Sequence, residues 1–371
     1  MRLSLGKQVT RFWYDVDNKL PTHGENYAVL DGVRGLAVFT VLLSHCGVFN
    51  MLGQGGLGVW LFFVLSGFLL SIPFVTEPQR AWSIKYTSKF IARRLLRIIP
   101  LYYFVILVVI FPKDKNLFWD HLIFAKADGH LWSLKQELIF YIIMPAIFAI
   151  IHSIPKIKPW VISLFLLFAS FLLDYYLTID KFSLVGNGKN LPFYCSIFML
   201  GISTAYMWQH IKSKRTSNVY SKLFTILGLL SLAAFFITSK ENRLLISDVL
   251  EIDILSNHEY LAWDFPWVFG LSCCILILSV LSSHKSSTLN AIFRNKILRM
   301  FGVLGYSMYL VHYFVLIFLQ QYGISDNKLI IFFLTLSITF LISCVTYGFI
   351  EKPFMRLLGS NRPKSQRKDG L

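Results

Sequence analysis

The sequence predicts an all-α polytopic membrane protein, a bundle of about ten transmembrane helices with both termini in the cytoplasm. Hydrophobic residues make up 55% and aromatic residues 16% of the 371 residues, and the mean hydropathy is +0.58. Apolar windows of about 20 residues, the length that crosses a bilayer, recur along the whole chain. Most of the 36 Lys and Arg residues fall in alternate connecting segments, which indicates the orientation by the positive-inside rule.

Ten apolar windows can be placed, and each is predicted to form one membrane helix. Their approximate bounds are 29–49, 57–76, 97–112, 133–152, 160–178, 191–210, 222–238, 265–283, 302–320 and 328–350. The chain then divides into a cytoplasmic N-terminal segment (1–28), one membrane domain (29–353) and a basic cytoplasmic tail (354–371). Residues 1–28 hold no continuous apolar core followed by a cleavage site, so we expect no cleaved signal peptide.

The net charge of +16 could indicate a nucleic-acid-binding protein, but the basic residues are scattered between apolar spans rather than gathered on one soluble face. We therefore expect a lipid bilayer and no nucleic acid as the partner of these charges. The five cysteines have no metal-like spacing, and neither do the nine histidines. We expect free thiols, no metal site and no permanently bound cofactor.

The first window contains Arg34 and His45, two ionisable residues in an otherwise apolar helix. Eleven helical steps of about 100° return to within roughly 20° of the starting direction, so both side chains lie on one face. Ionisable residues inside a span are costly and are by default functional candidates. The alternative is an arginine that reaches the headgroups and a histidine that bonds a neighbouring helix.

Depth estimates place the carboxylate of Glu137, near the start of the fourth window, beside the imidazole of His45. A carboxylate next to a histidine orients its tautomer and raises its basicity, as a general base requires. We therefore predict that His45 and Glu137 are catalytic. A structural hydrogen-bonded pair between packed helices is the alternative.

Arg97 begins the third window, at a depth close to that of Arg34. Two guanidinium groups at one level suit an anionic phosphate ligand, although Arg97 could also reach the lipid headgroups. In the ninth window, Tyr309 and His312 are three residues apart and share a face. We predict that they line the cavity and bind substrate, with hydrogen bonding between helices as the alternative. For Ser66, packing is the favoured role, since hydroxyls in spans commonly bond their own backbone.

Taken together, six segments resemble the acyltransferase-3 family of integral membrane acyltransferases. They are LDGVRGLAVFTVLLSH, GGLGVWLFFVLSGFLLS, RRLLRIIPLYY, LWSLKQELIFYIIMP, LGYSMYLVH and IEKPF. They occur in order and cover almost the whole chain. The resemblance implies a ten-span bundle that moves an acyl group from acyl-CoA to a carbohydrate hydroxyl. It also maps the essential arginine and histidine of the family onto Arg34 and His45, and the fourth-span acid onto Glu137. Some members append a soluble esterase-like domain, and we expect this chain to lack one.

Two functions of different class follow from these observations. The first is an O-acyltransferase of the cell (inner) membrane that uses acyl-CoA, with acetyl-CoA as the default, and acts on a glycan or lipid-linked saccharide. Because a thioester is already activated, this reaction needs no metal. The second is a transporter or channel in which Arg34, His45, Glu137 and His312 form a polar pathway. The second lacks the inverted repeat or matched broken helices that are typical of transporters.

Overall fold

The structure is a computed structural model, and the residues that it describes cover most of the predicted membrane domain. The described ranges are 27–48, 55–127, 129–154, 157–181, 191–213, 218–238 and 266–358, with Asn242, Leu244, Asp248 and Val249 besides. Most of the N-terminal segment, most of the basic tail and most of the loop at 239–264 lie outside them, and so do the expectations for those segments.

Helices form the regular structure of the described residues, and these residues contain no strand. The α-helices are α2 (Val29–His45), α3 (Gly55–Thr76), α4 (Ile84–Val109), α5 (Lys115–Leu122), α6 (Trp132–Ser153), α7 (Pro159–Lys181), α8 (Leu191–Ser213), α9 (Asn218–Ile237), α12 (Pro266–Ser282), α13 (Thr288–Phe293), α14 (Lys296–Val303), α15 (Gly305–Gln321), α16 (Lys328–Thr346) and α17 (Lys352–Leu357). Short turns of other helix types are η2 (Pro78–Trp82), η3 (Gly129–Leu131) and the π-helix η5 (Tyr347–Glu351). The all-α prediction is confirmed.

Each of the ten predicted windows coincides with a helix: α2, α3, α4, α6, α7, α8, α9, α12, α15 and α16. Within the described residues, five helices are long and apolar enough to cross a membrane, or six if the bent pair α14–α15 counts as one span. The protein is therefore built as a multi-pass membrane protein. Ten spans and cytoplasmic termini remain predictions.

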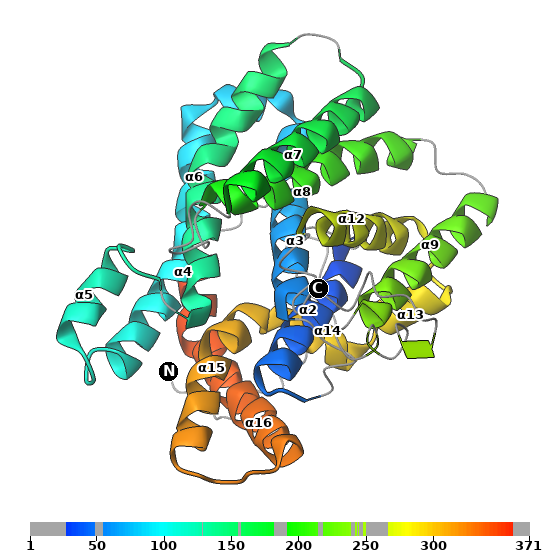
Figure 1. Ribbon diagram of the computed structural model, residues 1–371. Coiled ribbons are helices and arrows are strands. Elements are labelled where there is room, and N and C mark those ends of the chain that lie inside the picture. Colours follow the sequence, from blue (N-terminus) through cyan, green and yellow to red (C-terminus); the bar gives the residue numbers. More distant parts are fainter. Residues whose placement is uncertain are drawn as a thin grey trace, which may run out of the picture.

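Helix α3 lies at the centre of the molecule, with α2, α8 and α12 around it (Figure 1). In its apolar stretch 78% of the residues are buried, against 17% in α7 and in α9. These two outer helices instead expose large apolar side chains, for example Phe165, Phe168 and Leu230. An exposed apolar surface of this kind suits contact with lipid, as a peripheral membrane helix requires.

Helix α4 begins at Ile84, well before the apolar window predicted at 97–112. Ser83 caps it, since its side chain accepts a hydrogen bond from the Tyr86 N–H. The early turns carry the basic residues of KYTSKFIARR and are helical although they are charged. Hydropathy alone missed this start because helical hydrogen bonding does not depend on apolar side chains.

Helices α14 and α15 meet at a bend of 78° around Leu304, where the sequence predicted one continuous span. Before this bend, α14 packs backbone to backbone against α2. A Cβ atom at Gly302 would lie 1.6 Å from the Asp31 carbonyl oxygen, and one at Gly35 would lie 1.9 Å from that of Leu298. Small residues allow such close approach of membrane helices. The contact holds the helix that carries Arg34 against the bent pair.

We expect Gly302→Ala to destabilise the protein by about 1–3 kcal/mol, because the added methyl group meets backbone that cannot move aside. Thermal unfolding in detergent measures the effect. Gly348→Ala is the matched control, since nothing lies within 4 Å of a Cβ atom there. Equal melting temperatures for the two variants would contradict the close contact between α2 and α14.

Candidate active site

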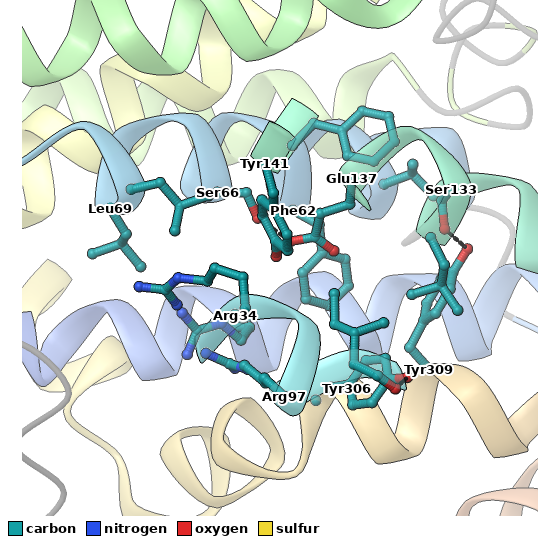
Figure 2. Close-up of a pocket in the computed structure, with 17 residues that line it drawn as sticks. Arg34, Phe62, Ser66, Leu69, Arg97, Ser133, Glu137, Tyr141, Tyr306 and Tyr309 are labelled. Carbon is teal, nitrogen blue, oxygen red and sulfur yellow. Dashed lines mark hydrogen bonds between the residues drawn. The ribbon is translucent and has the colours of Figure 1, made fainter. Parts of the chain in front are cut away.

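A cavity of about 80 Å³ lies between α2, α3, α4, α6 and α15, and Figure 2 shows the side chains that surround it. Its polar lining consists of Arg34, Ser66, Arg94, Arg97, Ser133, Glu137, Tyr141, Tyr306 and Tyr309. Its apolar lining comes mainly from Val59, Phe62, Phe63, Leu69, Leu70, Ile98 and Leu134. Residues from five helices that are distant in sequence thus converge on one internal space.

Three arginines supply positive charge to this cavity. Arg34 comes from α2, and Arg94 and Arg97 come from one face of α4 because they are three residues apart. The Nη1 atom of Arg34 donates to Asp31 Oδ1 at 2.8 Å, and only 15% of the Arg34 side chain is exposed. The Nε atom of Arg94 is buried and has no hydrogen-bond partner among the described residues. Planar guanidinium groups with donors to spare are suited to phosphate.

Glu137 supplies the negative charge on the opposite wall. Its Oε1 atom accepts a hydrogen bond of 2.7 Å from the Ser66 hydroxyl and another from the Tyr141 hydroxyl. Ser66 therefore bonds a side chain across the cavity rather than serving only in packing. The arrangement also explains how a carboxylate is kept in an apolar bundle, since hydroxyl donors and nearby arginines offset its desolvation.

A second polar cluster lies at the far end of α2, where His45 is the last helical residue and is exposed. His45 Nδ1 lies 2.9 Å from Nε2 of His312, which is fully buried on α15. His130 on η3 is also buried, and its Nε2 lies 2.9 Å from the Leu310 carbonyl oxygen. The ring centroids of His130 and His312 are 5.3 Å apart. Three histidines from three segments thus form one cluster.

Tyr309 links the cavity to the histidine cluster. Its hydroxyl lines the cavity, accepts from Ser133 at 2.7 Å and donates to the His130 carbonyl oxygen at 2.8 Å. Its ring centroid lies 5.7 Å from that of His312. The cavity and the exposed histidine are therefore connected through one side chain of α15.

The predicted pairing of His45 with Glu137 is wrong. Helix α3 runs back along α2, and Gly58 packs against the Ala37 carbonyl. From this contact, Ser66 lies eight residues further along α3, about 12 Å toward the start of α2. His45 lies eight residues further along α2, about 12 Å toward its end. Glu137, bonded to Ser66, is therefore far from His45.

The depth estimate failed because the chain enters the bundle before α6 begins. The turn η3 is already buried, with His130 among the side chains of α15, so the apparent outer surface near residue 133 lies inside the protein. Glu137 follows His130 by seven residues, about 10 Å of helix. This offset places Glu137 at the level of Arg34 instead of His45.

Sequence reasoning did not predict six polar residues of these clusters: Ser66, Arg94, His130, Ser133, Tyr141 and Tyr306. The spacing of Arg94 and Arg97 was a usable signal, since residues three apart share a helix face. No spacing connected Ser66 to its acid, and His130 stood outside the predicted span. Of the predicted site residues, Arg34, Arg97, Glu137 and Tyr309 line the cavity, while His45 and His312 form the histidine cluster. Their catalytic and binding roles remain predictions.

No group of three His, Cys, Asp or Glu side chains that could hold a metal ion occurs in the part of the chain that the structure describes. All five cysteines are free thiols, as the sequence predicts. Fold and site together define a helical multi-pass membrane protein with an internal, arginine-lined cavity. The chain belongs to the acyltransferase-3 family, because the family model described as "Acyltransferase domain" matches residues 27–348.

Relatives of known name are found in Staphylococcus aureus. The chain is 27% identical over 368 residues to "Putative O-acetyltransferase SACOL0978" of strain COL, and 24% identical over 366 residues to "O-acetyltransferase OatA" of strain NCTC 8325 / PS 47. Each comparison covers 88% of this chain and 57% of the relative, so the chain spans little more than half the length of these relatives. No solved structure matches the chain.

The separation of the two clusters predicts how variants combine. Effects of residues that are far apart and share no partner usually add as free energies, so losses of rate multiply. We expect the double variant His45→Ala with Glu137→Gln to lose acyl transfer by the product of the two single losses. Rates with a radiolabelled donor over long incubations measure the residual activity. A double variant no slower than His45→Ala alone would show that the two residues act as one unit.

Proposed function

We propose that the protein is a membrane O-acetyltransferase that moves an acyl group, acetyl in the simplest case, from acyl-CoA to a hydroxyl of a cell-envelope carbohydrate. Membership in the acyltransferase family and the names of the relatives support acyl transfer rather than transport. The observation that carries the proposal is the convergence of three arginines on one internal cavity.

The donor enters with its phosphates at Arg34, Arg94 and Arg97. These groups are charged at any physiological pH and bind phosphate oxygens through paired N–H donors. The pantetheine arm then extends along the cavity, past Phe62, toward Tyr309. Glu137 on the opposite wall keeps the arginines from forming an uncompensated cluster of positive charge. In this arrangement the thioester lies at the end of the cavity nearest the histidine cluster.

His45 acts as the general base. It lies about 16 Å along α2 from Arg34, a separation that an extended pantetheine arm can span. Its imidazole takes the proton of the acceptor hydroxyl while that oxygen attacks the thioester carbonyl carbon. The C–S bond then breaks, and the CoA thiolate receives the proton from His45. An ester and free CoA are the products.

Orientation and location form part of the proposal. The distribution of Lys and Arg supports cytoplasmic termini and residence in the cytoplasmic membrane. Arg34 then faces the cytoplasmic side, where acyl-CoA is made, and the exposed His45 faces the opposite side. A glycan or lipid-linked saccharide can reach His45 from there.

Replacement of His45 tests the reaction. We expect His45→Ala to lower the transfer of label from acetyl-CoA to an envelope glycan by at least about 100-fold, with expression and melting temperature unchanged. The purified protein in lipid nanodiscs is used for the measurement. His284→Ala is the control, because His284 is an exposed histidine outside the cavity and should leave the rate unchanged. Full activity of His45→Ala would remove His45 from the chemistry.

Donor binding is tested at the arginines. Arg34→Lys keeps the charge but loses the paired donors that match a phosphate, so we expect about tenfold weaker acetyl-CoA binding. Arg93→Lys makes the same chemical change on the exposed side of α4 and should leave the affinity unchanged. Titration calorimetry on the protein in detergent compares the variants. An unaltered dissociation constant in Arg34→Lys would exclude Arg34 from the phosphate site.

A further inference from the structure

The hydrogen bonds around His312 fix which of its ring nitrogens carries the proton. Its Nδ1 atom lies 2.6 Å from the Tyr309 carbonyl oxygen and 3.2 Å from that of Met308. A carbonyl oxygen can only accept, so Nδ1 must be the donor. In a neutral imidazole the other nitrogen then carries a lone pair. The Nε2 atom of His312 is therefore an acceptor.

This acceptor in turn fixes the tautomer of His45. His45 contacts His312 through its Nδ1 atom, which lies 2.9 Å from Nε2 of His312. Because Nε2 of His312 accepts, Nδ1 of His45 donates. The proton of neutral His45 thus resides on Nδ1, and its Nε2 atom holds the free lone pair that a base needs.

We propose that His312 is a positioning residue that holds His45 in its Nδ1–H tautomer, with Nε2 directed to the acceptor hydroxyl. The inference rests on the proposed function, in which His45 is the base. It gives His312 the orienting part that the sequence predicted for Glu137. The complete burial of His312 argues against the substrate contact predicted for it, whereas His45 is exposed.

The ring of His45 also has a hydrogen bond with the backbone of Val41, one turn earlier on α2. The other side chains near His45 do not compete with His312. His130 on η3 is committed through Nε2 to the Leu310 carbonyl oxygen. The Tyr313 ring on α15 packs against the His45 ring, with centroids 5.2 Å apart. Among the hydrogen bonds of the described residues, none joins these two side chains. Lys328, at the start of α16, lies near Gly47 and can only donate. Among the side chains of the described residues around His45, the acceptor for the Nδ1 proton is therefore His312.

The proton balance of the reaction is unchanged by this assignment. The acceptor hydroxyl gives its proton to Nε2 of His45, and the imidazolium so formed keeps its Nδ1–H bond to His312. The same Nε2 proton passes to the CoA thiolate when the C–S bond breaks. His312 neither gains nor loses a proton in either step. It contributes by orienting the His45 ring, which takes up the proton and releases it.

Two variants of His312 separate positioning from packing. His312→Leu fills similar space but offers no acceptor, whereas His312→Gln can place an amide oxygen near the original Nε2 position. We expect His312→Leu to lower kcat by about 10- to 100-fold, because a small misplacement of a reacting group costs up to about that much, with the dissociation constant for acetyl-CoA unchanged. His312→Gln should recover most of the rate. Equal rates for the two variants would overturn the proposal.

A spectroscopic measurement tests the tautomer without any substrate. The ¹⁵N chemical shifts of labelled histidine distinguish Nδ1–H from Nε2–H imidazoles, and the His45 signals are those lost in His45→Ala. We expect Nδ1–H in the wild-type protein in nanodiscs and a mixture with Nε2–H in His312→Leu. Nε2–H in the wild-type protein would overturn the inference even if acyl transfer is observed. A wild-type protein with the Nδ1–H tautomer but no acyl transfer would instead overturn the proposed function alone.

Discussion

The structure depends above all on keeping ionisable side chains inside an apolar bundle. A charge in such an interior is tolerated only with partners that offset its desolvation. Arg34 meets this condition through Asp31, one turn away on the same helix, and Glu137 through the hydroxyls of Ser66 and Tyr141. Because Ser66 lies on α3 and Glu137 on α6, the same requirement also joins two of the central helices.

The same requirement divides the polar interior into two clusters of different character. The cavity is lined by residues of formally charged types, three arginines and a glutamate. The far end of α2 holds histidines, whose neutral form can be buried at lower cost. A site that binds phosphate needs permanent charge, and a site that moves a proton needs a group that changes its charge. The two kinds of chemistry are thus placed at opposite ends of one helix.

Much of the fold could be predicted from the sequence because membrane helices leave a strong local signal. Runs of apolar residues located ten of the fourteen α-helices that the structure describes, and helical periodicity placed Arg34 and His45 on one face of α2. The bend at Leu304 and the early start of α4 escaped notice, since neither depends on hydropathy. The chain carries no local sign that backbone will pack against backbone at Gly302.

The candidate site was predicted in part, for a related reason. Residues on one helix could be related by counting along it, Arg34 with His45 and Tyr309 with His312. Arg34 and Tyr309 do line the polar cavity. Contacts between helices required a common depth scale, and the buried turn before α6 displaced that scale by about two helical turns. Ser66 and His130 were missed for the same reason. Their partners lie on other segments, and only the packed bundle brings them together.

The close contact between α2 and α14 helps to fix the distance between the cavity and the histidine cluster. Gly302 at the end of α14 touches the Asp31 backbone, and His312, beyond the bend, touches His45, so one continuous segment is attached to α2 at both of its ends. In the proposed reaction, the length of α2 between Arg34 and His45 therefore measures the carrier arm of the donor. A donor with a shorter or longer arm between phosphate and thioester would bind its phosphates normally and still place its carbonyl away from the base. Selectivity for the carrier is then set by a length of helix instead of by contacts to the carrier itself.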